Sequence, residues 1–146
     1  MSRGYGIALL LLATCAAFLV AAAHLSCIYF GPQCYAAQMA PSFVVESARA
    51  GTLLAPLLTV VVSAIFIMLG CYALSAAQFI RRLPFLRVGI YSISVICIVR
   101  GVLPIQLFFR NPEKISEPVL MAGIAWLVVG LCYWFGFRAV KKHCIR

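Results

Sequence analysis

Four stretches of this 146-residue chain are long and apolar enough to cross a lipid bilayer. Residues 4–23, 51–80 and 118–137 contain no charged side chain, and residues 88–109 contain only Arg100. A helix needs about 20 apolar residues to cross the roughly 30 Å of hydrocarbon in a bilayer. Strands of a membrane barrel would alternate apolar and polar residues, which these stretches do not. We therefore predict transmembrane helices, which satisfy their own backbone hydrogen bonds in lipid.

The expected fold is an all-α integral membrane protein, an antiparallel four-transmembrane-helix bundle. The spans are predicted at about 5–25, 54–80, 88–107 and 118–138, in a single transmembrane domain covering 1–146. Short connections make consecutive helices antiparallel neighbours. In the longest connection, Pro41 and Ser42 are expected to open a short helix at the membrane surface. Pro104 is expected to kink or end the third span, because proline cannot donate the helical backbone hydrogen bond.

The distribution of basic residues predicts how the chain crosses the membrane. Eight lie at the chain ends and in the connection between the second and third spans: Arg3, Arg81, Arg82, Arg87, Arg138, Lys141, Lys142 and Arg146. The two other connections hold only Arg49, Arg110 and Lys114, together with all three acids, Glu46, Glu113 and Glu117. Lys and Arg collect on the cytoplasmic side. We therefore expect a multi-pass protein of the inner (plasma) membrane with both termini cytoplasmic, and we attribute the net charge of +9 to topology and lipid contact rather than to nucleic acid.

The first span resembles a secretory signal in one respect. Arg3 precedes an apolar run that ends in three small residues, Ala21 to Ala23. The run is about 20 residues long, whereas the apolar part of a signal peptide usually has 7–15. We expect a retained helix; cleavage after Ala23 would instead leave three spans with the same remaining topology.

Small residues recur along the predicted spans and indicate where helices meet. They follow a spacing of seven at Pro56, Ser63, Gly70 and Ala77 and at Gly123 and Gly130, and a spacing of four at Ala13, Ala17 and Ala21. Small side chains let membrane helices approach closely, so that dispersion forces can hold them together. We expect Ser63, Gly70, Gly123 and Gly130 to lie at helix contacts, within the chain or with a second copy or another membrane protein.

Arg100 is the residue that fits its surroundings least. It lies 13 residues beyond Arg87, or about 19 Å along a helix, and a charge at that depth has to be paired or hydrated. One interpretation is that its long side chain reaches up to the outer headgroups. The other is a ligand-binding or structural polar cluster in an outward-facing pocket, formed by Arg100 with Glu46 and His24.

The chain has seven cysteines, but their positions do not indicate a redox or metal centre. Cys27 and Cys34 are on the predicted outer side, where an oxidising compartment would allow a disulfide. Their spacing is not the Cys-x-x-Cys of thiol oxidoreductases. The sequence shows no metal-ligand spacing, phosphate loop or nucleophile–base motif. We therefore expect no cofactor and no metal, and the sequence favours a protein that is not an enzyme.

Several short motifs of the chain carry a resemblance to a known family. The matching segments are His24-Leu25, Tyr29-Phe30-Gly31-Pro32 with Tyr35, Tyr72-Ala73-Leu74-Ser75-Ala76-Ala77, Arg81-Arg82-Leu83-Pro84 and Arg100-Gly101. They resemble a family of small uncharacterised bacterial inner-membrane proteins with four predicted spans, and the resemblance covers most of the chain although the motifs are short. The resemblance implies location and topology but no activity.

Three functions follow as hypotheses. The first is an accessory or self-associating membrane subunit without catalytic chemistry, whose partners are the lipid bilayer and a second copy or another membrane protein. The second is a binder or carrier of a small amphiphile or anion, with the outward-facing pocket around Arg100 as its site. The third is an outer-side thiol redox protein that uses Cys27 and Cys34.

Overall fold

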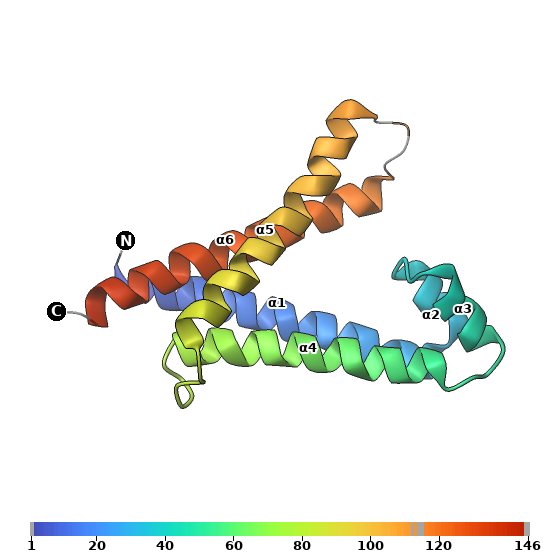
Figure 1. Cartoon of the computed structure of the whole chain (residues 1–146), viewed down its shortest axis with the longest axis horizontal. Coiled ribbons are helices and arrows are strands. Elements are labelled where there is room, and N and C mark those ends of the chain that lie inside the picture. Colours follow the sequence, from blue (N-terminus) through green and yellow to red (C-terminus); the bar gives the residue numbers. More distant parts are fainter. Residues whose placement is uncertain (1, 112, 114–115, 145–146) are drawn as a thin grey trace. The chain divides into compact units, whose positions relative to one another are not determined.

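A computed structural model describes residues 2–111, 113 and 116–144, with side chains through Lys141 (Figure 1). Its helices are α1 (Arg3–Phe30), α2 (Pro32–Ala37), α3 (Ser42–Arg49), α4 (Leu54–Ala76), α5 (Leu86–Arg110) and α6 (Glu117–Cys144), and the described part of the chain contains no strand. Four of them, α1, α4, α5 and α6, are long and apolar enough to cross a membrane. The predicted all-α fold with four such helices is confirmed, and the chain is a multi-pass membrane protein.

The ends of the long helices differ from the predicted spans. Helix α1 continues to Phe30, beyond the predicted end at 25, and α4 ends at Ala76 rather than near 80. Helix α5 runs through Pro104 to Arg110, so of the two effects expected of this proline, a kink or an end of the helix, the end does not occur. A proline removes a single backbone donor, the one that would bond the carbonyl of Arg100, and helices in membranes tolerate that loss.

Two short helices fill the longest connection. Helix α3 begins at Ser42, directly after Pro41, and is the short helix expected there. Helix α2 was not predicted, because Gly31-Pro32 reads as a turn. Proline has no N–H to lose in the first turn of a helix, however, so Pro32 opens α2 at no cost. Of the predicted second outer loop, Pro112 and Lys114 lie outside the described residues, as does Arg146 of the basic tail.

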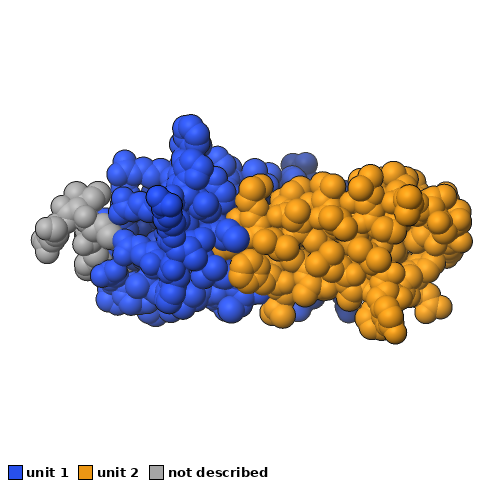
Figure 2. Space-filling model, turned by 90° about the horizontal axis from the view of Figure 1, so that it is seen from below, with its two compact units in different colours: residues 1–15, 71–146 blue, residues 16–70 orange. Residues whose placement is uncertain are grey.

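The chain divides into two compact units (Figure 2). One holds residues 1–15 and 71–146, and the other holds residues 16–70. Helices α1 and α4 each contribute one part to each unit. The predicted single domain 1–146 therefore contains two compact units.

In the first unit, α5 and α6 form an antiparallel pair at small residues. A Cβ added to Gly101 would lie 2.5 Å from the backbone nitrogen of Leu127 and 2.7 Å from the carbonyl oxygen of Gly123. About two turns earlier on α5, the buried hydroxyl of Ser94 donates to the carbonyl of Gly130 at 2.7 Å. Close backbone approach of this kind holds membrane helices together through dispersion and interhelical hydrogen bonds.

In the second unit, residues 16–30 of α1 lie antiparallel to residues 54–70 of α4. The ring of Phe18 covers Gly70, where an added Cβ would lie 2.5 Å from the ring. The buried hydroxyl of Ser63 donates to the carbonyl of Ala21 at 3.3 Å. Ser63, Gly70, Gly123 and Gly130, the residues expected at helix contacts, are thus all buried against a neighbouring helix.

Candidate functional site

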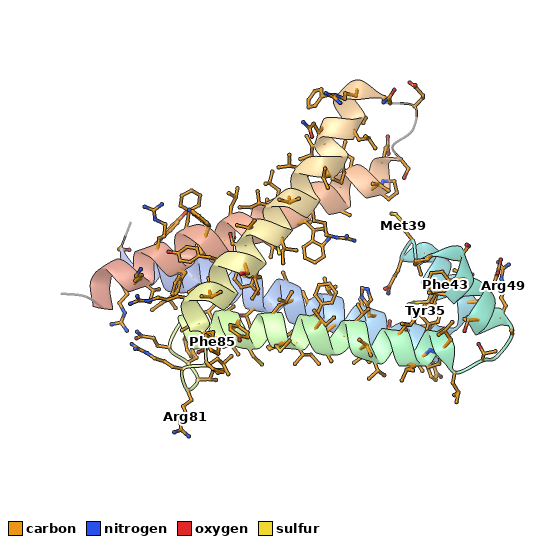
Figure 3. All side chains as sticks on the ribbon, in the orientation of Figure 1. Tyr35, Met39, Phe43, Arg49, Arg81 and Phe85 are labelled. Atoms are coloured by element: carbon orange, nitrogen blue, oxygen red, sulfur yellow. A yellow bond between two sulfur atoms is a disulfide. The ribbon has the colours of Figure 1, made fainter. Side chains whose placement is uncertain are left out.

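A basic cavity lies where the loop between α4 and α5 meets the last turns of α6, within the first unit. Its volume is about 390 Å³. Its basic lining residues are Arg82, Arg87 and Lys141, and its apolar ones include Leu83, Phe85, Leu86, Val88, Phe137 and Val140. Figure 3 labels Phe85 and Arg81 on this loop; Arg81 is exposed and does not line the cavity.

The loop begins with a tight cap on the end of α4. The N–H of Phe79 donates to the carbonyl of Leu74 at 3.0 Å, and the N–H of Gln78 donates to that of Ser75 at 3.2 Å. This pair of bonds is the Schellman arrangement, which requires a left-handed residue after the helix. Gln78 takes that conformation, with φ of 68°. The cap ends α4 four residues before its apolar run does and turns the chain towards α5.

Ser75 then fixes the middle of the loop. Its hydroxyl donates to the carbonyl of Arg81 at 3.1 Å and accepts the N–H of Leu83 at 2.9 Å. The hydroxyl of Tyr72 donates to the carbonyl of Pro84 at 3.2 Å. Two side chains of α4 therefore hold the backbone on both sides of Arg82, and the loop has a defined shape where it lines the cavity.

Phe85 closes the loop in a second left-handed conformation, with φ of 52°. Its carbonyl accepts the N–H of Gly89 at 2.8 Å, so it serves as the cap of α5. Phe85 lines the cavity and is 83% exposed. A bulky residue in this conformation costs about 1–2 kcal/mol, and such local strain is often found at ligand sites.

Among the described residues that line the cavity, Arg82, Arg87 and Lys141 are charged and none is acidic. Two of the three acids, Glu113 and Glu117, follow the far end of α5, about 36 Å from Leu86 along the helix. The third, Glu46, belongs to the other unit. The cavity offers guanidinium and ammonium groups beside aromatic and aliphatic side chains. This combination suits a ligand with an anionic group and an apolar body, and the Ser75 hydroxyl is already engaged by the loop backbone.

The three residues of the expected outward-facing cluster each have a different environment. Nδ1 of His24 lies 2.9 Å from the carbonyl oxygen of Val20, and its ring packs against Phe66 with centroids 5.4 Å apart. Glu46 is exposed on α3. Arg100 is exposed on α5, with its guanidinium carbon 5.5 Å from the ring centre of Trp126. His24 and Glu46 belong to one unit and Arg100 to the other, and the pocket they were expected to share remains a prediction.

Cys27 and Cys34 form a disulfide in the second unit, with Cα atoms 5.1 Å apart. Cys27 is 1% exposed and packs in a small core with Tyr35, Val44 and Ala55. The bridge ties the end of α1 to α2, and its burial fits a structural bond. Among the described residues, no group of three side chains could hold a metal ion.

The sequence did not reveal the cavity, although it carried a signal. Arg82, Arg87 and Lys141 are interpreted from the sequence only as topology markers, yet residues 81–88 combine three arginines with leucine, phenylalanine and valine side chains. Comparison of the chain with protein-family models, with curated proteins and with solved structures finds no match.

Proposed function

We propose that this protein binds an anionic amphiphile at the cytoplasmic face of the inner membrane, without catalysing a reaction on it. The observation that carries the proposal is the cavity lined both by the cations Arg82, Arg87 and Lys141 and by apolar residues. Its cations recognise the anionic group, and its apolar wall accepts the adjoining hydrocarbon. This proposal keeps the amphiphile-binding hypothesis but places the site at the N-terminal end of α5 instead of around Arg100.

The charge distribution supports the cytoplasmic location of the cavity. The loop that lines it belongs to the side with eight basic residues, opposite the side with three. Basic residues collect on the cytoplasmic side, where anionic lipids give the leaflet a negative surface potential. The resemblance to a family of bacterial inner-membrane proteins implies the same membrane and topology.

The expected strength of recognition follows from the number of cations. Each Lys or Arg near an anionic membrane surface contributes about 1 kcal/mol. Removing two of the three lining cations should therefore cost about 2 kcal/mol, or roughly 30-fold in affinity. Binding of a zwitterionic amphiphile with the same chains would gain little from these cations.

The other hypotheses have less support. Self-association through small residues is weakened because Gly123 and Gly130 already lie against α5 within the chain. A redox role for the outer cysteines is weakened because Cys27 is buried in the core beneath α2 and α3. An accessory membrane subunit remains compatible with lipid binding, since a bound lipid can be part of the partner's docking surface.

The binding test uses the full chain in a neutral maltoside detergent. Calorimetric titration compares dihexanoylphosphatidylglycerol with dihexanoylphosphatidylcholine, which differ in headgroup charge but not in chains. We expect preference for the anionic amphiphile and its loss in an Arg82→Gln/Arg87→Gln double variant. The matched control, Arg49→Gln/Arg110→Gln, removes two cations that do not line the cavity and should change the affinity less than twofold. Equal affinities for the two amphiphiles, or an unchanged affinity in the first variant, would refute the proposal.

The topology is tested separately by labelling intact cells with a membrane-impermeant maleimide. If the connection after α1 is outside and bridged, Cys27 and Cys34 label only after reduction, and Cys144 does not label. Labelling of Cys144 alone would place the basic cavity on the outer side and overturn the cytoplasmic part of the proposal.

A further inference from the structure

We infer that the amphiphile is a membrane phospholipid, one of whose acyl chains lies in an apolar groove on α5 and α6. The inference rests on the proposed function and adds the identity of the ligand. The groove has a volume of about 300 Å³ and lies in the same unit as the basic cavity. It is lined by Val95, Ile98, Val99, Leu131, Trp134 and Phe135.

The helical register places the groove in line with the basic cavity. Val88 lines the cavity, and Val95 and Val99 of the groove follow it by 7 and 11 residues. At 3.6 residues per turn, both positions lie within about 20° of Val88 around α5. On α6, Trp134 of the groove precedes Lys141 of the cavity by seven residues, so these two residues also lie within about 20° of one another around their helix. The two hollows therefore share one side of the helix pair.

Aromatic side chains join the two hollows. The ring of Tyr91 lies 5.1 Å from that of Trp134, which lines the groove, and 5.6 Å from that of Phe137, which lines the cavity. Both contacts are edge-to-face, a favoured geometry for aromatic pairs. Tyr91 lies between Val88 and Val95 along α5, so an apolar wall continues from the cations to the groove.

The length of this path matches one leaflet. Val88 and Val99 are separated by 11 residues, or about 16 Å along the helix, and half of the hydrocarbon core is about 15 Å. A ligand that filled both hollows would have an anionic head at the membrane surface and an extended chain reaching the midplane. An anionic phospholipid has this form, whereas a free phosphate would occupy only the cavity.

Native mass spectrometry of the full chain, released from detergent, tests the inference. The probes are dioleoylphosphatidylglycerol, dioleoylphosphatidylcholine and glycerol 3-phosphate. Val95→Trp fills the groove, and Ile96→Trp is its matched control, since Ile96 is the neighbouring exposed residue (65% against 49%) and does not line the groove. Val99→Trp serves as a second groove variant if Val95→Trp does not fold.

We expect the wild-type chain and Ile96→Trp to retain the anionic phospholipid equally, within twofold. Val95→Trp should retain at least fivefold less, while binding of glycerol 3-phosphate in solution titration stays unchanged. If the Trp variants retain the lipid like wild type, but Arg82→Gln/Arg87→Gln loses it, the groove inference is wrong and the proposed function stands. If the charge variant also retains the lipid and the zwitterionic lipid is retained equally, the retained lipid is not recognised by the cavity and both proposals fail.

Discussion

The backbone N–H of Leu83 donates a 2.9 Å hydrogen bond to the hydroxyl oxygen of Ser75, eight residues earlier in the chain. The same hydroxyl donates to the carbonyl of Arg81, and Ser75 is 1% exposed. One small side chain therefore holds the backbone on both sides of Arg82. Because Arg82 lines the basic cavity, we expect the proposed binding of an anionic amphiphile to depend on Ser75, a residue that does not carry charge.

Ser75→Ala should lower both stability and amphiphile affinity. The change removes two hydrogen bonds and leaves the N–H of Leu83 without its partner, which costs about 1–3 kcal/mol. Unfolding in mixed micelles gives the stability, and calorimetric titration with dihexanoylphosphatidylglycerol gives the affinity. Ser92→Ala, at an exposed position on α5, is the control and should change stability by less than about 0.5 kcal/mol. Equal effects of the two variants would contradict this role of Ser75.

Gln78 should be replaceable by glycine more readily than by alanine. Its φ of 68° places it in the left-handed region, where a Cβ costs about 1–2 kcal/mol. Both substitutions remove the side-chain oxygen that accepts a bond from Arg3 at 2.7 Å, so their difference isolates the backbone conformation. We expect Gln78→Gly to be about 1 kcal/mol more stable than Gln78→Ala in a micelle unfolding experiment. The reverse order would show that Gln78 is not in this conformation.

Gly101→Ala should destabilise the pairing of α5 with α6. The new methyl group would meet the backbone of Leu127 and Gly123, which cannot move away as a flexible side chain can. Overpacking of this kind costs about 1–3 kcal/mol. The control is Gly4→Ala, where nothing lies within 4 Å of the added carbon and the gain in helix propensity should stabilise slightly. A neutral Gly101→Ala would mean that the two helices are not this close.

Removal of the Cys27–Cys34 bridge should loosen the region of α2 and α3 without affecting lipid retention at the basic cavity. Both cysteines lie in the unit of residues 16–70, and the cavity belongs to the other unit. A bridge across a short loop contributes about 2–3 kcal/mol. We expect Cys27→Ser/Cys34→Ser to increase proteolysis between residues 31 and 53, and dihexanoylphosphatidylglycerol affinity to stay within twofold. Unchanged proteolysis would show that the buried core around Tyr35 suffices without the bridge.

The sequence was sufficient to predict the four long helices, because their formation depends on local composition. Four apolar runs were enough to locate α1, α4, α5 and α6, since lipid permits few alternatives to a helix. The end of α4 was missed by four residues because it depends on the cap at Gln78, and glutamine is not a usual signal for a left-handed residue. The continuation of α5 was left open because the effect of Pro104 depends on its neighbours.

The candidate site was missed for a different reason. Arg82 and Arg87 flank one loop, whereas Lys141 comes from the last turns of α6, more than fifty residues later. Their convergence depends on the packing of α5 against α6 and on the shape that Ser75 gives to the loop. The sequence indicates Arg100 as a candidate site residue instead, because it is the one charged residue in the apolar run 88–109.

Arg100 and Trp126 should show a measurable coupling energy. The guanidinium lies 5.5 Å from the ring centre, within the range of a cation–π interaction, which contributes about 0.5–2 kcal/mol. In a double-mutant cycle, Arg100→Leu and Trp126→Leu are measured singly and together by unfolding in mixed micelles. The control cycle pairs Arg100→Leu with Trp134→Leu, whose ring packs on Tyr91 instead.

We expect a coupling of about 1 kcal/mol in the first cycle and less than about 0.5 kcal/mol in the control. The single Arg100→Leu change has a further consequence, because an arginine deep in the membrane carries an insertion cost of about 2.5–3.5 kcal/mol. If Trp126 compensates only part of that cost, Arg100→Leu will insert more favourably than the wild type in a translocon assay. If insertion is unchanged, the guanidinium reaches water or headgroups, which is the snorkelling interpretation. A first cycle no larger than its control would show that Trp126 does not hold Arg100.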